Sequence, residues 1–288
     1  VDGPVVYFVD HFFRDHELIG RLPMEKGDQL HFVDSSSEPE VTRIDAFKEA
    51  VSAADSRTPC CVVGIGGGNA LDTAKAVANL LTNPGKAEDY QGWELVKNPA
   101  VYKIGIPTLS GTGSECSRTC VLTNIPKNLK LGMNSDYTVY DQLLLDPDLL
   151  ATVPRDQYFY TGIDTFMHCV ESLQGSYRNA IIDAFSVRAV QLCEEIFLSD
   201  DMMSEENREK MMIASYIGGM AAGNVGVIHP FSAGLGVVLH VAHGLGNCLA
   251  LNVLGDIYPK EYKQFRTMIE RQGVNLPTGI CKDLTEEQ

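Results

Sequence analysis

The sequence predicts an α/β N-terminal domain with a mostly parallel, Rossmann-like sheet, followed by an all-α C-terminal domain. Apolar runs alternate with helix-periodic segments over the first ~145 residues, which is typical of a sheet covered on both faces. Beyond Asp146-Pro147, apolar residues recur at helical spacing with no clear alternating strand. We therefore predict two domains, 1–148 and 149–288. The length of 288 residues also suggests roughly two domains.

Each predicted element follows from a short pattern. Strands are expected where apolar runs end at a polar residue or at glycine, within 4–10, 28–34, 59–68, 102–115 and 138–147. Helices are expected at 11–22, 41–55 and 69–82 between these strands. In the second domain, helical periodicity marks 148–175, 180–200 and 204–223, and later segments continue in the same way.

Composition and charge exclude several classes of function. The formal net charge of -15 argues against nucleic acid or an anionic membrane as partner, because both would be repelled. There is no apolar run near eighteen residues and no signal-peptide pattern. The eight cysteines form no CxxC pair and mostly lie in apolar segments, which favours free thiols in a reducing cytoplasm.

Four polar residues of the second domain suggest a metal site. Asp164 and His168 are four apart and would project from one face of a helix, and His229 and His243 follow in a glycine-rich stretch. One carboxylate and three imidazoles can hold a divalent metal with positions left for water or substrate. Taken alone, each histidine could instead be an ordinary core or surface residue whose ring presents a polar tip.

A glycine loop in the first domain suggests a phosphate site. Gly66, Gly67 and Gly68 follow an apolar run and open a helix, so backbone N–H groups and the helix dipole would face an anion. The loop is neither GxGxxG nor a P-loop, and a tight strand-to-helix turn is the alternative. A second loop, IPTLSGTGSE, adds Thr108 and Thr112, and two such loops suit a dinucleotide.

The end of the first strand bears on cofactor choice. Asp10 stands where an acid accepts a hydrogen bond from a ribose hydroxyl and repels a 2′-phosphate, which favours NAD(H) over NADP(H).

The motifs GGGNALDTAK, IPTLSGTGSE, DPDLLATVP, TGIDTFMH and HVAHGLGN together resemble the iron-containing (group III) alcohol dehydrogenase family, in order along nearly the whole chain. The resemblance implies a dehydroquinate synthase-like architecture and a homodimer. It also implies a divalent metal, Fe²⁺ first, with Zn²⁺ and Mn²⁺ compatible with the same donors. Its metal ligands fall on Asp164, His168, His229 and His243; its nucleotide residues fall on Gly66, Gly67, Gly68, Asn69, Asp72, Thr108, Thr112 and Lys130.

The chain departs from the family pattern at the expected proton relay. The family usually carries a second histidine where Ala233 stands, so His240, water or the substrate would take over that role. Leu109 and Asn69 replace a frequent threonine and serine. Members usually continue for tens of residues past this C-terminus, so we expect the helical domain to be incomplete there.

Within the family, NVGVIHPFSAGLGVVLHVAHGLGN and Ala233 are most similar to the 3-deoxy-D-manno-octulosonate (Kdo) 8-oxidase branch, which acts in lipopolysaccharide biosynthesis. The resemblance implies oxidation of the terminal primary alcohol of that sugar acid by hydride transfer to a nicotinamide. Another group III enzyme acting on small alcohols or aldehydes is one alternative. A dehydroquinate synthase or glycerol-1-phosphate dehydrogenase relative is a second, although few basic residues, with Arg155, Arg178 and Arg188 the nearest, accompany the ligands. A catalytically idle nucleotide-binding protein is a third.

Overall fold

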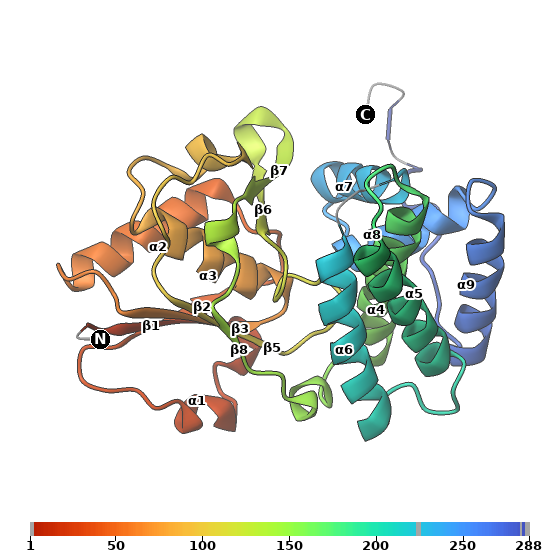
Figure 1. The fold of residues 1–288 in the computed structure, drawn as a ribbon, viewed down its shortest axis with the longest axis horizontal. Helices are drawn as coiled ribbons and strands as arrows, with labels where there is room; N and C mark the ends of the chain where they lie inside the picture. Colours follow the sequence, from red (N-terminus) through yellow and green to blue (C-terminus); the bar gives the residue numbers. More distant parts are fainter. Residues whose placement is uncertain (1–2, 223–225, 283, 286–288) are drawn as a thin grey trace. The chain divides into compact units, whose positions relative to one another are not determined.

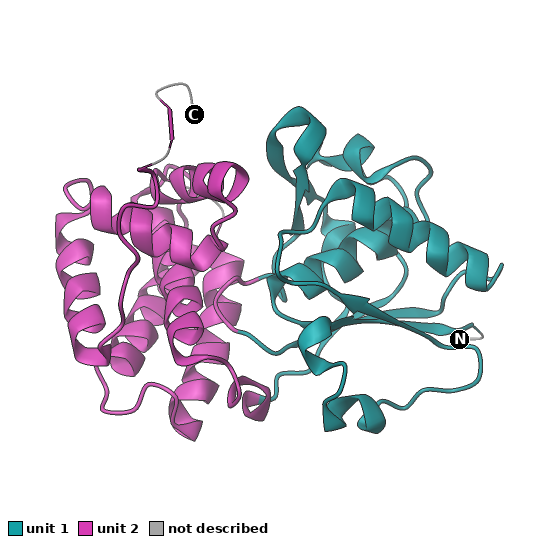
Figure 2. Ribbon diagram, turned by 180° about the vertical axis from the view of Figure 1, so that it is seen from behind, with its two compact units in different colours: residues 1–109, 114–146 teal, residues 110–113, 147–288 magenta. Residues whose placement is uncertain are grey.

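The computed structural model describes residues 3–222, 226–282 and 284–285. The chain divides into two compact units, coloured separately in Figure 2. Unit 1 comprises 1–109 and 114–146, and unit 2 comprises 110–113 and 147–288. The short segment 110–113 thus belongs to the second unit although its neighbours on both sides belong to the first.

Unit 1 is built on a five-stranded parallel sheet. Its strand order is β2-β1-β3-β5-β8, with bounds Gln29–Val33, Val5–Asp10, Cys61–Gly66, Lys103–Pro107 and Gln142–Leu143. These strands are the five apolar runs that the sequence analysis assigned to strands. The chain goes from β1 to β2 on one side and then crosses to β3 on the other, so the order reverses at the β1/β3 boundary. Ligands of open parallel sheets bind at the carboxyl ends of strands at such a reversal.

Both faces of this sheet are covered, which explains why its central strands are apolar without alternation. Val6, Phe8 and Val62 pack under α2 (Val41–Ala54) and α3 (Gly68–Leu80) on one face (Figure 1). On the other face, Tyr7, Val9 and Ile65 pack with Phe13 of the segment that follows β1.

The segment expected as one helix at 11–22 is instead two short turns. A 3-10 turn covers His11–Phe13, and α1 covers Glu17–Arg21. Each has its own cap, because the Asp10 side chain accepts from the N–H of Phe12 and His16 Nδ1 accepts from that of Leu18. Two adjacent caps favour two helix starts over a continuous helix.

A small second sheet was not foreseen from the sequence. Its order is β4-β7-β6, with bounds Gly92–Trp93, Leu129–Asn134 and Thr119–Asn124, and β6 and β7 form an antiparallel hairpin. The turn includes Asn128 in the left-handed region at φ 47°, a conformation that asparagine tolerates better than most residues. Further short 3-10 turns lie at Ala87–Tyr90, Ile125–Lys127, Asp136–Thr138 and Pro147–Leu150.

The described elements of unit 2 beyond Leu150 are α-helices: α4 (Arg155–Gln174), α5 (Ala180–Phe197), α6 (Glu205–Ala221), α7 (Ile228–Leu239), α8 (His243–Val253) and α9 (Pro259–Gln272). An α/β unit and a helical unit are what the sequence predicted, so the fold class is confirmed. Helix α4 is buried over most of its circumference, with Phe159, Ile163 and Phe166 fully covered. In the part of the chain that is described, no helix has the length and apolar character to cross a bilayer.

The segment 110–113 is fixed within unit 2 by contacts to α4 and α6. The N–H of Gly111 donates to Ser215 Oγ at 2.8 Å, and Thr165 Oγ1 donates to its carbonyl at 2.8 Å. Only glycine fits at this position, because φ is +142° and a Cβ would meet the carbonyl oxygen of Thr161.

Candidate metal centre and nucleotide loops

Helix α4 supplies two of the predicted ligands. Asp164 and His168 lie one turn apart in its central part, where a 20-residue helix beginning after Pro154 continues without interruption. Asp164 is fully buried, and the side chain of His168 is 13 % exposed. A buried carboxylate is costly unless it is paired or bound to a cation, so its partners are informative.

The two remaining predicted ligands stand at the starts of helices. His229 is the second residue of α7, and His243 is the first residue of α8. The chain leaves α7 at His240, which caps the helix in the left-handed region at φ 55°. Because the chain breaks between α7 and α8, His229 and His243 each lie in the first turn of a separate helix.

The three imidazoles converge on one carboxylate oxygen. The Nε2 atoms of His229, His168 and His243 lie 3.3, 3.6 and 3.7 Å from Oδ1 of Asp164. Ligands about 2.1 Å from a shared metal would be about 3.4 Å apart at the corners of a tetrahedron. The donors of Asp164, His168 and His229 all lie within 4.8 Å of one another, while the His243 side chain is 27 % exposed. The donor set and its spacing therefore fit a divalent metal.

Unsatisfied polar atoms support the same fit. Among the described residues, Oδ2 of Asp164 and Nδ1 of His168 are buried without a hydrogen-bond partner. Buried polar atoms without partners are rare and usually have a functional reason. Oδ2 belongs to the carboxylate on which the three imidazoles converge, and a cation bound by that carboxylate would account for an oxygen left without a donor.

The charges at this site are strongly coupled. Burial alone would raise the pKa of Asp164, but His168, His243 and His229 hold that pKa well below its usual range. Burial lowers the pKa of His168 to about 4. Burial also opposes a charge on His229, yet the carboxylates of Asp164 and Glu171 raise the pKa of His229 to about 9. The protonation of each of these side chains therefore depends on the charges of the others.

Three further residues at this site were missed by the sequence analysis. Asn247 Nδ2 donates to Asp164 Oδ1 at 2.7 Å, Glu171 Oε2 lies 2.5 Å from His229 Nδ1, and Ser232 Oγ lies 3.2 Å from His243 Nδ1. Glu171 had a usable signal, since it is seven residues after Asp164 and three after His168 on one helix face. Asn247 likewise lies one turn after His243.

In unit 1, the glycine loop and Asp10 come together at the carboxyl ends of β1 and β3. A Cβ at Gly66, whose φ is +152°, would lie 2.6 Å from that of Ala70 and 3.0 Å from that of Asp10. Gly67 is the N-cap of α3 and has no side chain to bond to the first turn of the helix. The N–H groups of that turn are therefore not capped by their own N-cap residue.

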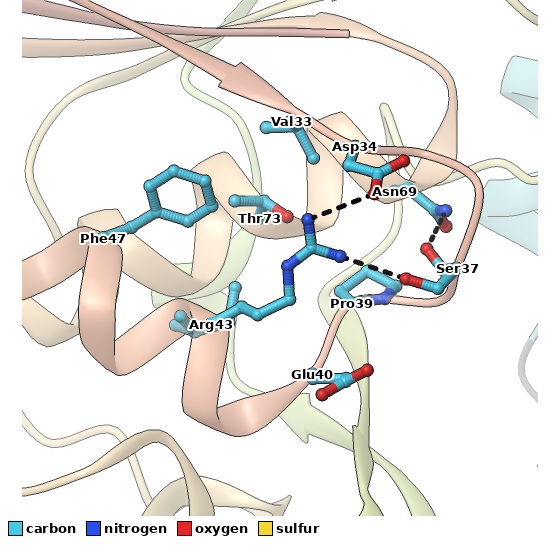
Figure 3. A pocket seen from close by; sticks show the side chains of 10 residues that line it. Val33, Asp34, Ser37, Pro39, Glu40, Arg43, Phe47, Asn69 and Thr73 are labelled. Atoms are coloured by element: carbon cyan, nitrogen blue, oxygen red, sulfur yellow. Dashed lines mark hydrogen bonds and ion pairs between the residues drawn. The ribbon is translucent and has the colours of Figure 1, made fainter. Parts of the chain in front are cut away.

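Thr108 and Asn69 also lie at this loop. The N–H of Thr108 donates to the carbonyl of Gly66 at 3.0 Å. Asn69 Nδ2 donates to the carbonyl of Ser37 at 2.8 Å, which ties the chain after β2 to the start of α3. Asn69 also lines a pocket between the end of β2 and the first turns of α2 and α3 (Figure 3). Arg43 reaches across this pocket to Ser37 Oγ at 3.0 Å and Asp34 at 3.7 Å.

Asp72 makes several hydrogen bonds and an ion pair with other residues of unit 1. Its carboxylate accepts from Ser114 Oγ and from the N–H of Val121 at 2.8 Å, and it pairs with Lys75 at 3.5 Å. Lys75 is fully buried and also donates to the carbonyl of Ser114 at 2.7 Å. Burial raises the pKa of Asp72, and Lys75 opposes that rise. These contacts connect α3 to the chain around Ser114 and Val121.

The other predicted site residues are more dispersed. Lys130 on β7 pairs with Glu38 at 2.8 Å in unit 1. Thr112 belongs to unit 2, whereas Thr108 belongs to unit 1. His240 is exposed at the end of α7. Their assignments to cofactor and proton relay stay predictions.

Comparisons with known proteins identify the family of this chain. Residues 15–147 match the family model of the iron-containing alcohol dehydrogenases, and residues 158–282 match that of the Fe-containing alcohol dehydrogenase C-terminal region. The chain is 34 % identical over 220 residues to the sulfoacetaldehyde reductase of Bilophila wadsworthia, covering 74 % of this chain and 56 % of that protein. It is 32 % identical over 208 residues to the NAD-dependent methanol dehydrogenase of Bacillus methanolicus, covering 71 % and 53 %.

Solved structures show the same fold over nearly the whole chain. Sulfoacetaldehyde reductase from Bifidobacterium kashiwanohense, solved in complex with NAD+, superposes with a TM-score of 0.83 at 25 % identity, over 99 % of this chain and 82 % of that one. A 1,3-propanediol oxidoreductase superposes with a TM-score of 0.78 at 27 % identity, over 96 % and 74 %. The chain spans about half the length of the curated relatives named above. By both of its family matches, this chain belongs to the iron-containing alcohol dehydrogenase family.

Proposed function

We propose that this protein is a metal-dependent oxidoreductase that interconverts a primary alcohol and an aldehyde with NAD(H). The observation that carries the proposal is the convergence of three imidazole Nε2 atoms on Oδ1 of Asp164. The names of the relatives, a sulfoacetaldehyde reductase and a methanol dehydrogenase, support the reaction class.

Asp164, His168, His229 and His243 would hold the metal. The carboxylate contributes one negative charge, and each neutral imidazole contributes an Nε2 lone pair. Iron follows from the family, and zinc and manganese suit the same donors.

Gly66, Gly67 and Gly68 with the first turn of α3 would bind the pyrophosphate, since Gly67 leaves the N–H groups of that turn without a side-chain cap and the helix dipole favours an anion there. Asp10 at the end of β1 would accept from the ribose hydroxyls. Asn69, Thr108, Thr112 and Lys130 are proposed as further cofactor contacts. Asp72 is proposed to act indirectly, by fixing α3.

When bound, a divalent metal supplies Lewis acidity that favours loss of the alcohol proton, and nicotinamide accepts the hydride. The protein residues orient the donors and exclude water from Asp164, which is fully buried. Asn247 holds Oδ1 of Asp164 by its amide. The proton leaves through water, the substrate or His240, because Ala233 has no ionisable group.

For the substrate, we propose the C8 alcohol of Kdo on the resemblance of the α7 stretch, including Ala233. That small side chain is half-buried on α7 and leaves room that a polyhydroxylated substrate would use. The arginines considered for its carboxylate are engaged elsewhere: Arg155 with Gln272, Arg178 with Asp183 and Arg188 with Glu195. The same engagement weakens the phosphate-binding alternative of the dehydroquinate synthase type. A homodimer in the cytoplasm stays a prediction.

The test is turnover by metal-loaded protein with NAD+ and a panel of Kdo, 2-hydroxyethanesulfonate, methanol and 1,3-propanediol, followed at the reduced-nicotinamide absorbance. Turnover of any alcohol that is lost in Asp164→Asn supports the oxidoreductase. The Kdo assignment requires a higher kcat/KM for Kdo than for the other three. Metal and NAD+ binding without turnover on any of these alcohols would favour the idle nucleotide-binding protein.

A further inference from the structure

Glu171 is a buried carboxylate that the proposed reaction does not use directly. It lies on α4, two turns after Asp164, and is 1 % exposed. Its Oε2 lies 2.5 Å from Nδ1 of His229, and its Oε1 accepts from the N–H of Ile228 at 2.6 Å. Tyr258 Oη donates to Oε1 at 3.3 Å. A fully buried acid whose partners all donate to it is held in the ionised form.

The contact determines which nitrogen of His229 carries a proton. Nδ1 must carry a proton to donate to Glu171, so a ring that gives up one proton to bind a cation gives it up from Nε2, the nitrogen that faces Asp164. A carboxylate on the far side of a ligating imidazole orients the ring and increases its basicity. Glu171 thus sets both the direction and the donor strength of one proposed ligand.

The other two imidazoles are held differently. Nδ1 of His243 lies 3.2 Å from the neutral Ser232 Oγ, and Nδ1 of His168 is without a hydrogen-bond partner among the described residues. Nδ1 of His229, in contrast, faces a carboxylate at 2.5 Å.

We propose that Glu171 is a positioning residue of the metal centre: it fixes the tautomer and orientation of His229. This inference rests on the metal site of the proposed function. It adds a residue that does not touch the metal but determines how tightly the metal is held.

A purely structural role is the competing explanation. Val227, the N-cap of α7, makes no side-chain cap bond, and Glu171 bonds to the N–H of the first residue of that helix. Glu171 could therefore serve only as a cap supplied by another helix. A cap affects the unfolding temperature of the metal-free protein, whereas a positioning residue affects metal affinity in protein that remains folded.

The test measures Zn²⁺ affinity of the whole chain by competition with a chromogenic chelator, with circular dichroism to establish the folded fraction. Glu171→Gln keeps the shape and removes the charge, and we expect Zn²⁺ to bind about 10- to 100-fold more weakly. Tyr258→Phe is the matched control, because it removes another donor to the same carboxylate but leaves the His229 contact. Its affinity should stay within about threefold of wild type.

A double-variant cycle separates the two roles. If Glu171 acts through His229, Glu171→Gln should weaken Zn²⁺ binding by less than about threefold when His229→Ala is already present. An unchanged affinity in the single variant, or an undiminished loss in the double variant, would overturn the proposal. If Glu171→Gln does not fold, Glu171→Asp is measured instead, and wild-type affinity there would likewise overturn it. Failure of the wild-type protein to bind Zn²⁺ would reject the metal site itself.

Discussion

Asn247 on α8 donates from Nδ2 to Oδ1 of Asp164 on α4 at 2.7 Å. Asn247 is fully buried and lies one turn after His243, so an amide and an imidazole from the same helix face one carboxylate oxygen. The bond fixes the Asp164 rotamer and leaves Oδ2 as the acceptor without a partner among the described residues. The orientation of the proposed ligand thus depends on a neutral residue that never needs to touch a metal.

Replacing Asn247 by Leu should weaken metal binding. Leucine has a similar volume but cannot donate, so Asp164 would lose its shortest hydrogen bond, and we expect about a tenfold weaker affinity for Zn²⁺. Chelator competition measures the change. The control is Asn252→Leu, at an exposed position on the same helix, where Asn252 accepts a 3.3 Å bond from Arg266. Equal affinities for the two variants would contradict the role of Asn247.

Metal should also stabilise the fold. The carboxylates of Asp164 and Glu171 are buried, and burying negative charge costs free energy. A cation that binds only to the folded protein offsets this cost and so stabilises the fold. Free Zn²⁺ at one hundred times its Kd should raise the free energy of unfolding by about 2.7 kcal/mol. Urea unfolding with and without Zn²⁺ measures the difference, and Asp164→Asn should abolish it. A wild-type protein indifferent to Zn²⁺ would argue against a ligand set.

The acid at the end of β1 should determine cofactor choice. Asp10→Asn keeps a side-chain oxygen for the N–H of Phe12 but removes the charge that repels a 2′-phosphate. We expect the preference for NAD+ over NADP+, as a ratio of kcat/KM, to fall by about tenfold. Asp34→Asn, an acid after the neighbouring strand that pairs with Arg43, is the control. A preference that moves equally in both variants would remove the special role of Asp10.

A side chain at the glycine loop should block the nucleotide. A Cβ at Gly67 would lie 3.3 Å from Leu109 Cδ2, a flexible methyl group, so Gly67→Val should fold. The branched side chain would then stand at the start of α3, and we expect NAD+ affinity in calorimetry to fall by more than about tenfold. Gly20→Val, where a Cβ meets nothing within 4 Å, is the control for loss of glycine. Unchanged NAD+ affinity in Gly67→Val would place the cofactor elsewhere.

Much of the sheet could be predicted because its strands are buried on both faces. Such strands read as uninterrupted apolar runs, as in Val5–Asp10 and Cys61–Gly66. The hairpin of β6 and β7 was missed because Thr119–Asn124 and Leu129–Asn134 mix polar and apolar residues, and strand propensity depends strongly on context.

The candidate site was predictable where spacing along one helix carried the information, as for Asp164 and His168. Glu171 shares that helix face, but an isolated glutamate on a helix is usually solvated, and only the packing of α7 places His229 against it. The motif around Asp72 predicts a cofactor contact, which stays a prediction. Its contact to Ser114 could not be read from that motif, because Ser114 lies far along the chain.

The most direct test of the account is the metal content of the purified wild-type chain and of the His229→Ala/His243→Ala double variant, each loaded with Fe²⁺ or Zn²⁺ and then dialysed. The three convergent imidazoles predict about one metal ion per wild-type chain and close to none in the double variant, with circular dichroism unchanged. Equal metal content in the two proteins would contradict the assignment of these histidines as ligands, and with it the proposed chemistry.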